Sequence, residues 1–332
     1  MDLLTQGLVG ASIPLILSNK KQLGAAGLAG FLAGMAPDLD ALIRSPTDGL
    51  LFLEYHRQFT HSFLFIPIGG AIVALVLFPI LNLRRRVGFL VLWLWCCLGF
   101  GTHGILDAAT SYGTQLLWPF SEARYAFRLI SIVDPIFSIP ILIGILASIF
   151  LKKKKWCIYA VIWSLCYLVF ANIQRDSAHA SAEQLASARG HIPARLVVKP
   201  TFGNTFLWRS IYEFDGRFYV DAIRTVSGAL QVPGSSIEKL NVSEQFPWLK
   251  EGTQQRKDLE RFARFSDGFI AQGDGGSDTV SDIRYSFLPN TIEPLWSIRL
   301  RRDASDTQHV TYETHREKPA QKFSTLVKMI FQ

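Results

Sequence analysis

The chain has 332 residues, of which 49% are hydrophobic and only 18% charged, and its mean hydropathy is +0.22. Soluble domains carry about 25% charged residues, and the shortage is confined to one half of this chain. Residues 1–174 hold 13 Lys/Arg and 8 Asp/Glu, whereas residues 175–332 hold 21 and 19. This distribution excludes a single cytosolic globule, a disordered chain and a fibrous protein. It predicts a mainly α-helical membrane protein, with a multi-pass helical bundle in 1–174 and a soluble α+β domain in 175–332.

Four apolar runs have the length of about 20 residues that a helix needs to cross a bilayer. They cover residues 62–81, 87–106, 130–151 and 156–173. Two shorter runs, 3–17 and 23–35, precede them and are rich in Gly and Ala, which let helix backbones approach closely in lipid. The pattern predicts about six spans, the first two forming a tight helical hairpin.

Nine basic residues of the first half lie in three clusters at alternate loops: Lys20-Lys21, Arg84-Arg85-Arg86 and Lys152–Lys155. Basic residues beside membrane spans favour the cytoplasmic side, so all three clusters fit one side of the membrane. The net charge of +7 therefore reflects membrane topology, and we expect no nucleic-acid partner. The loops 36–61 and 107–129 and the domain 175–332 are predicted to be extracytoplasmic.

The second half begins with an Ala-rich polar stretch, 175–189, which predicts a helix leading out of the membrane and ending at Gly190. Two aromatic and β-branched runs, 205–214 and 217–224, flank Asp215-Gly216, which is a strong hairpin turn signal. These features predict a helix followed by a β-hairpin.

Further along, apolar and polar residues alternate in 283–287 and again in 296–300, as in half-buried strands. Leu259, Phe262 and Ala263 stand at helical spacing ahead of Gly268, which predicts a helix that stops there. The tail is therefore expected to combine helices and strands.

Ionisable residues gather on the predicted outer face. Asp38 and Asp40 follow the second apolar run, and two carboxylates so close on a loop can point at one cation, although a turn beside Pro37 explains them equally. His56 and His61 stand at the outer mouth of the next run; the alternative is a polar interfacial loop with incidental histidines.

His103 and Asp107 are four residues apart inside an apolar run, so they share one helix face. A metal site or an acid–base pair needs such a pairing; the alternative is a hydrogen bond that holds helices together. Asp134 precedes Pro135 near the start of another run. It is either a metal ligand or a residue that favours the helix dipole.

Together these positions form a mixed nitrogen and oxygen set that suits Zn, or else Mn or non-haem Fe, and permits one or two ions. The predicted metal ligands are Asp38, Asp40, His56, His61, His103, Asp107 and Asp134, with His103 and Asp107 also as the catalytic pair. Arg57, Arg124 and Arg128 lie in the same outer loops and are predicted to bind a phosphate.

The order of these motifs resembles the YdjM-type membrane-bound metal-dependent hydrolases over about residues 1–175. The matching stretches are Met1-Asp2-x-x-Thr5-Gln6-x-x-x-Gly10, Pro37-Asp38-x-Asp40, His56-Arg57-x-x-Thr60-His61-Ser62, His103-x-x-x-Asp107-x-x-Thr110-x-x-Gly113, Trp118-Pro119-Phe120 and Asp134-Pro135. The resemblance implies a multi-pass bacterial inner-membrane protein whose Asp38, Asp40, His56, His61, His103 and Asp107 bind metal. Some members carry His where this chain has Gln6, so the resemblance implies that one ligand is missing or replaced here.

A remote likeness to helical zinc phospholipases C suggests phosphoester chemistry, and the tail resembles the extension of a proteobacterial branch, around Arg189-Gly190-His191 and Trp208-Arg209. We therefore expect a hydrolase in which an activated water attacks a phosphoester of a membrane lipid or lipid-linked substrate. The alternatives are a transporter or ion-handling protein that uses His103, Asp107 and Asp134, or a membrane anchor whose tail binds a partner.

Overall fold

The computed structural model describes residues 1–331 except 86, 227–229, 274–276 and 318. The chain divides into two compact units. The first contains Met1–Leu42, Tyr55–Ile173 and Phe202–Asn204, and the second contains Ile43–Glu54, Gln174–Thr201 and Thr205–Gln332. The predicted boundary near residue 174 therefore lies at a junction of the units, but 43–54 belongs to the second one.

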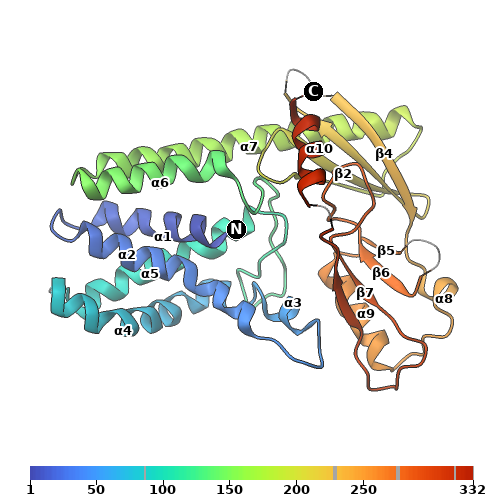
Figure 1. Ribbon diagram of the computed structural model, residues 1–332, viewed down its shortest axis with the longest axis horizontal. Helices are drawn as coiled ribbons and strands as arrows, with labels where there is room; N and C mark the ends of the chain where they lie inside the picture. The colour runs from blue at the N-terminus through green and yellow to red at the C-terminus, as the bar shows by residue number, and fades with distance from the viewer. Residues whose placement is uncertain (86, 227–229, 274–276, 318, 332) are drawn as a thin grey trace. The chain divides into compact units, whose positions relative to one another are not determined.

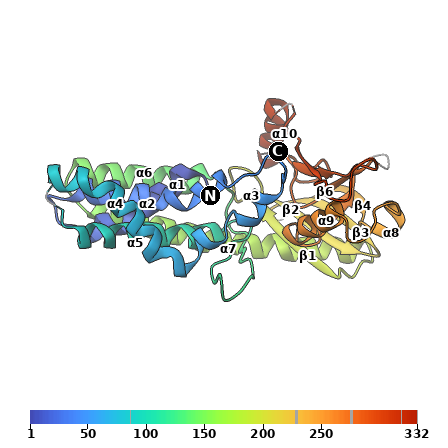
Figure 2. The same ribbon diagram turned by 90° about the horizontal axis from the view of Figure 1, so that it is seen from below.

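The first unit is a helical bundle (Figures 1 and 2). Its helices and 3₁₀ segments are α1 (Leu3–Leu17), α2 (Leu23–Met35), η1 (Ala36–Leu42), η2 (Phe59–His61), η3 (Phe63–Phe65), α4 (Ile66–Arg85), α5 (Phe89–Ala108), α6 (Pro135–Phe150) and the first part of α7 (Lys155–Ala188); the short helix α3 (Leu51–Tyr55) lies at the junction with the second unit.

Small residues let the first helices approach one another closely. A Cβ atom on Gly10 of α1 would lie 2.5 Å from the carbonyl oxygen of Gly30 in α2, and one on Gly99 of α5 would lie 2.4 Å from the same oxygen. Any side chain at these glycines would therefore push the backbones apart. The predicted tight hairpin of α1 and α2 is confirmed, and α5 packs against it by the same means.

Three helical segments of the described chain are long and apolar enough to cross a membrane: Phe63–Asn82, Phe89–Ala108 and Lys155–Ala188. The predicted span 130–151 forms a helix only from Pro135, because Asp134 caps that helix by accepting the amide hydrogen of Phe137. The resulting 16 residues rise about 24 Å, less than the hydrocarbon thickness of about 30 Å. α7 joins the last predicted span and the polar stretch after it in one helix of 34 residues.

The three basic clusters lie at one end of this bundle. Lys20 and Lys21 lie between α1 and α2, α4 ends at Arg85, and Lys152 lies in the turn between α6 and α7. These connections appear together at the left end of the bundle in Figure 1. The opposite end carries η1, the end of α5 and the start of α6.

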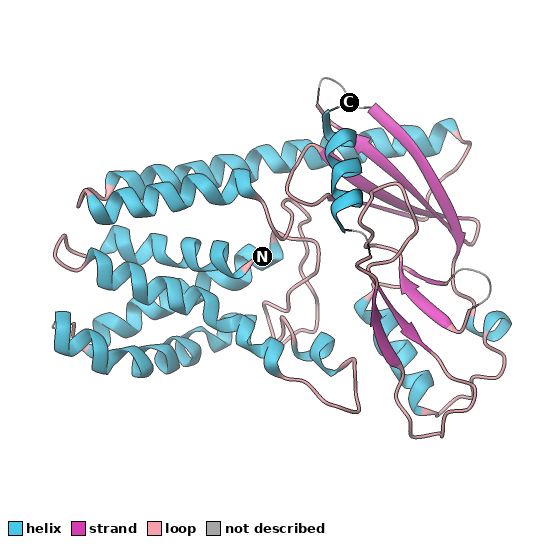
Figure 3. Cartoon of the chain, in the orientation of Figure 1, coloured by secondary structure: helices cyan, strands magenta, loops and turns pink. Residues whose placement is uncertain are grey.

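The second unit contains the strands of the protein (Figure 3). One antiparallel sheet has the order β1-β2-β3-β4, and the other has the order β5-β6-β7-β8. The bounds are β1 (Arg195–Pro200), β2 (Leu207–Phe214), β3 (Arg217–Arg224), β4 (Leu230–Glu238), β5 (Ile270–Gln272), β6 (Thr279–Asp282), β7 (Trp296–Arg299) and β8 (Thr311–Thr314). The helices are the end of α7, α8 (Val242–Gln245), α9 (Gln254–Phe265) and α10 (Pro319–Phe331).

The predicted hairpin is confirmed as β2 and β3. Asp215 and Gly216 both have positive φ angles, 48° and 68°, which match the twist of a two-residue hairpin turn. The predicted helix around Leu259 and Phe262 is α9, and Gly268 with φ 68° follows its end.

One predicted strand is misplaced. The strand expected over 283–287 ends earlier, at Asp282 of β6. The carboxylate of Asp282 accepts hydrogen bonds from both the backbone amide and the guanidinium of Arg284, which turns the chain out of the sheet. Ile283 and Tyr285 are buried as expected, but the polar residues Asp282 and Arg284 are buried too, so the predicted alternation of buried and exposed side chains is wrong here. Trp296 and Ile298 lie in β7 as predicted.

Candidate metal centre

Four ionisable side chains from distant parts of the first unit converge. Asp38 lies in η1, directly after α2, and His61 ends η2. His103 and Asp107 lie one turn apart near the end of α5, and both side chains are 0% exposed. Asp38, His61, His103 and Asp107 each offer one ligand atom to a common point, with all four atoms within 4.8 Å of one another.

The spacing of these atoms fits a tetrahedral ion. The two Nε2 atoms of His61 and His103 are 2.9 Å apart. Asp38 Oδ1 lies 3.5 Å from the first and 3.3 Å from the second, and Asp107 Oδ2 lies 3.4 Å and 3.9 Å from them. Ligands at 2.0–2.1 Å from a tetrahedral Zn²⁺ are separated by about 3.3 Å. The observed distances scatter around that value.

Outer hydrogen bonds fix which ring nitrogens face the centre. His103 Nδ1 donates to the carbonyl oxygen of Gly34 at 2.6 Å, and His61 Nδ1 lies 3.2 Å from the carboxylate of Asp40. A neutral imidazole has one N–H, so both Nε2 atoms present lone pairs inward. Partners of this kind orient metal-binding histidines in many proteins.

With both imidazoles neutral, the four converging atoms are all hydrogen-bond acceptors, and no hydrogen lies between them. Asp107 Oδ2 is buried and accepts no hydrogen bond of acceptable geometry from the described residues. Buried lone pairs that face one another need a cation between them, either a metal ion or a proton on an imidazole. Burial lowers the pKa of His61, but the neighbouring carboxylates of Asp107, Asp38 and Asp40 raise it to about 10, so without a metal ion a proton on this ring is the cation.

A second group of candidate ligands shares one carboxylate, Asp38, with the first. Asp38, Asp40 and His56 also offer ligand atoms within 4.8 Å of one another. His56 Nδ1 lies 2.7 Å from Asp40 Oδ1, and Thr60 donates to Asp40 Oδ2 at 2.6 Å. Burial raises the pKa of Asp40, but the neighbouring histidines lower it below its usual range. Asp40 thus connects His56 to His61 and borders both groups.

Arg57 is buried within the site. It has a φ of 64° and 4% exposure. Its Nε lies 2.9 Å from Asp107 Oδ2, and its guanidinium donates to the hydroxyl of Thr110 at 3.0 Å. The predicted phosphate-binding residue therefore points at the metal-site carboxylate.

Other groups complete the surroundings of Asp107. Gln6 donates to Asp107 Oδ1 at 2.8 Å, and the ammonium group of Met1 contacts the same oxygen. The buried Gln6 Oε1 has no hydrogen-bond partner among the described residues. Thr60, Thr110 and Gln6 were not among the predicted site residues; their only sequence signal is their position within the motifs that carry the family resemblance.

The other predicted residues make different contacts. Asp134 caps α6 and accepts a hydrogen bond from the hydroxyl of Tyr167 at 2.9 Å, and the groups of convergent ligand atoms do not include it. Arg128 donates locally to the carbonyl of Ala126 at 3.4 Å. Arg124 is closer to the site, since it donates to the carbonyl oxygen of His56 at 3.4 Å.

Comparison with known proteins identifies the family. A family model described as YdjM inner membrane protein matches residues 1–178, more than half of the chain. The chain belongs to the YdjM inner membrane protein family. Membership of the YdjM family and the apolar helices indicate an inner-membrane protein.

Two curated relatives support this assignment. Over 122 residues the chain is 30% identical to the uncharacterized protein YfhP of Bacillus subtilis (strain 168). This match covers 37% of this chain and 36% of YfhP. Over 101 residues it is 33% identical to the inner membrane protein YbcI of Escherichia coli (strain K12), covering 29% of this chain and 55% of that protein. The matches span about a third and about half of these relatives. No solved structure matches the chain.

Proposed function

We propose that this member of the YdjM family is a metal-dependent hydrolase whose centre is formed by Asp38, His61, His103 and Asp107. The observation that supports this most is the convergence of four lone-pair atoms, three of them on buried residues, at the spacing of a tetrahedral ion. Zn²⁺ suits two imidazoles and two carboxylates best, and Mn²⁺ or Fe²⁺ also accept such a set. The group of Asp38, Asp40 and His56 is a candidate for a second ion.

A bound ion of this kind acts as a Lewis acid toward an ester oxygen and lowers the pKa of water. The protein groups then have separate tasks. His103 and Asp107, predicted as the catalytic pair, are fully buried and are assigned to metal binding. When only the four-atom centre holds an ion, His56 is assigned the role of proton acceptor, because its ring is 22% exposed and its Nδ1 is held by Asp40.

The surroundings of the site favour a lipid substrate. Leu39, between the two site carboxylates, is 63% exposed, Leu42 is 77% exposed and Phe120 is 83% exposed. Such apolar side chains beside a polar centre suit the membrane–water interface. Arg124, which contacts the His56 carbonyl, is the cation best placed to bind a phosphate. A phosphoester of a lipid or lipid-linked molecule is therefore the proposed substrate.

The proposed location of the site is the outer face of the inner membrane. The basic clusters lie at the opposite end of the bundle from η1 and the end of α5 (Figure 1). If those clusters are cytoplasmic, the metal centre and the domain after α7 are extracytoplasmic.

The test of the proposed hydrolase measures both bound metal and substrate turnover. Full-length protein, supplemented with Zn, Mn or Fe and freed of excess ions, should contain at least one ion per chain and release phosphate or a phosphorylated head group from phospholipid or isoprenoid phosphate vesicles. His61→Ala should lose metal and activity together. Bound metal without turnover of any such substrate would contradict the hydrolase and leave the metal centre intact.

One observation favours a second candidate, a transporter or a protein that handles ions or protons. Arg57 lies 2.9 Å from Asp107 and offsets part of the negative charge of the centre without a metal. A conduction path would need polar groups through the membrane depth. The buried ionisable side chains among the described residues of the first unit are all at the outer end of the bundle: Asp40, Arg57, His61, His103, Asp107 and Asp134. This distribution favours the hydrolase.

A further inference from the structure

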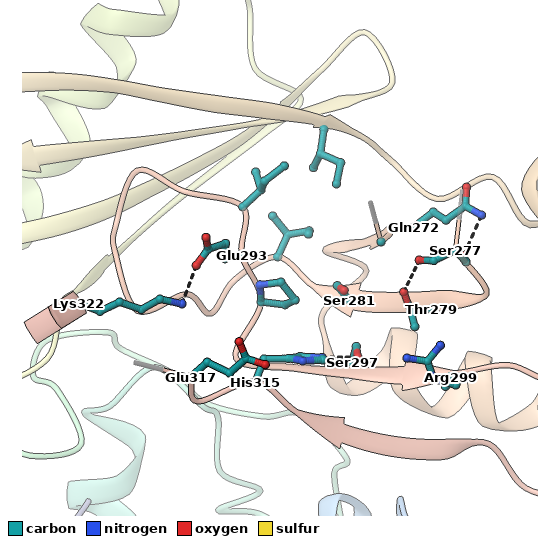
Figure 4. A pocket seen from close by; sticks show the side chains of 15 residues that line it. Gln272, Ser277, Thr279, Ser281, Glu293, Ser297, Arg299, His315, Glu317 and Lys322 are labelled. Atoms are coloured by element: carbon teal, nitrogen blue, oxygen red, sulfur yellow. Dashed lines mark hydrogen bonds and ion pairs between the residues drawn. The ribbon is translucent and has the colours of Figure 1, made fainter. Parts of the chain in front are cut away.

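The second unit contains a pocket of about 350 Å³, which is within the range of small-molecule sites. Residues of β5, β6 and β7 line it, together with Ile237 of β4 in the other sheet, and Figure 4 shows its polar side chains. Its polar residues come mainly from β6, β7 and the segment before α10. No residue of the candidate metal centre lines it.

The floor of the pocket is rich in hydroxyl groups. Ser281 of β6 and Ser297 of β7 are 4% and 1% exposed. Ser297 Oγ lies 2.8 Å from His315 Nε2, and the hydroxyls of Ser277 and Thr279 are 2.6 Å apart. An apolar ligand would remove water from these groups without replacing its hydrogen bonds, which is costly. The pocket therefore favours a ligand that both donates and accepts hydrogen bonds.

The charged side chains that line the pocket are two cations, Arg299 and Lys322, and two carboxylates, Glu293 and Glu317. Arg299 binds Glu313 through two nitrogens, at 2.6 and 2.9 Å, and Lys322 donates to Glu293 at 2.6 Å. Each cation is thus held by a carboxylate, and each still has further N–H groups for a ligand. An anionic ligand would have to compete with these carboxylates. The arrangement favours an uncharged ligand.

The remaining wall is apolar. Ile237, Ile283 and Ile292 line it, together with Pro294. A sugar ring has hydroxyl groups around its edge and carbon–hydrogen faces that pack on aliphatic side chains. We infer that this pocket binds a neutral saccharide of roughly one or two sugar rings, with Ser297, Arg299 and Lys322 as the main polar contacts.

The test uses full-length protein in lipid nanodiscs, since glycoside detergents would themselves compete for the pocket. Saturation-transfer NMR and calorimetry would measure binding of maltose and diacetylchitobiose as neutral probes and glucose 6-phosphate as the anionic probe. A neutral disaccharide should bind and the phosphate ester should bind at least tenfold more weakly. Replacing maltose by dodecyl maltoside distinguishes two sources of the sugar. If the natural ligand is a glycolipid, dodecyl maltoside should bind more tightly than maltose. If it is a free glycan, dodecyl maltoside should not bind more tightly.

Variants locate the binding in the pocket. Ser297→Val and Lys322→Ala should each weaken the disaccharide at least tenfold. The control is Arg301→Ala, which removes an ion pair with Asp303 two residues after β7 and outside the pocket; it should leave binding unchanged. No binding of either neutral saccharide, preference for glucose 6-phosphate, or binding unaffected by both pocket variants would each overturn the inference.

Discussion

The substitution Asp107→Asn tests the centre with the least change of shape. Both carboxylate oxygens face donors: Oδ1 faces the amide of Gln6 at 2.8 Å and Oδ2 faces Arg57 Nε at 2.9 Å. In either orientation the new amide nitrogen would therefore meet another donor. The substitution also removes one of the two negative charges of the four-atom group.

The expected loss is large. Removing one partner of a buried ion pair costs about 3–5 kcal/mol, and each 1.4 kcal/mol is a factor of ten in an equilibrium constant. If the Asp107 carboxylate stabilises a bound metal ion by a similar free energy, its loss should lower metal affinity by at least a hundredfold. Hydrolysis should be abolished, while the protein still inserts in the membrane.

The matched control is Asp134→Asn, which makes the same chemical change at another fully buried aspartate. Asp134 accepts from the backbone of Phe137 and the hydroxyl of Tyr167, and Asn is also a good helix N-cap. Elemental analysis at equal membrane yield should show metal retained in Asp134→Asn and lost in Asp107→Asn. Equal metal and activity in both variants would refute the reasoning and leave Asp107 as a residue that only holds helices together.

Three further predictions concern topology, the surroundings of the centre and the second unit. A reporter fused after Gln332 should behave as periplasmic; a cytoplasmic signal would reverse the proposed orientation. Asp40→Asn should lower metal affinity by about 10–100-fold, the range for residues that orient ligands, because Asp40 holds His61 and His56; unchanged affinity in a metal titration would remove that role. Burial raises the pKa of Asp48, but Arg261 and the amide of Leu50 lower it overall, so its stabilising effect should be present above the unfolded pKa and be lost as the pH falls below about 4. In thermal melts, Asp48→Asn should lose less stability than the wild type as the pH falls below about 4. The same pH dependence in both proteins would contradict this role of Asp48.

The fold was predictable where one physical signal dominates. Apolar length identified the helices of 62–81 and 87–106, and Asp215-Gly216 identified the hairpin of β2 and β3. The alternation in 283–287 predicted neither the strand nor the exposed face, because the hydrogen bonds between Asp282 and Arg284 end the strand and bury both polar side chains. β8 and α10 lacked a comparable signal and were not predicted.

The site was predictable in its residues more than in its arrangement. The helical spacing of His103 and Asp107 correctly placed them on one face, and the 3₁₀ segments η1 and η2 bring Asp38 and His61 to them. The sequence could not show that Arg57 turns inward, since that depends on a positive φ angle and on the carboxylate it meets. Asp134 was predicted with the candidate ligands, but its carboxylate caps α6 and accepts a hydrogen bond from the hydroxyl of Tyr167 in α7.

Occupancy of the four-atom centre by a metal ion is measured most directly by the metal content of the protein. Full-length protein supplemented with Zn, Mn and Fe, then freed of excess ions, should retain at least one ion per chain, with nitrogen and oxygen ligands at about 2.0–2.1 Å in the X-ray absorption spectrum if the ion is Zn. Protein that retains none of these metals, or binds them through sulfur, would contradict the account.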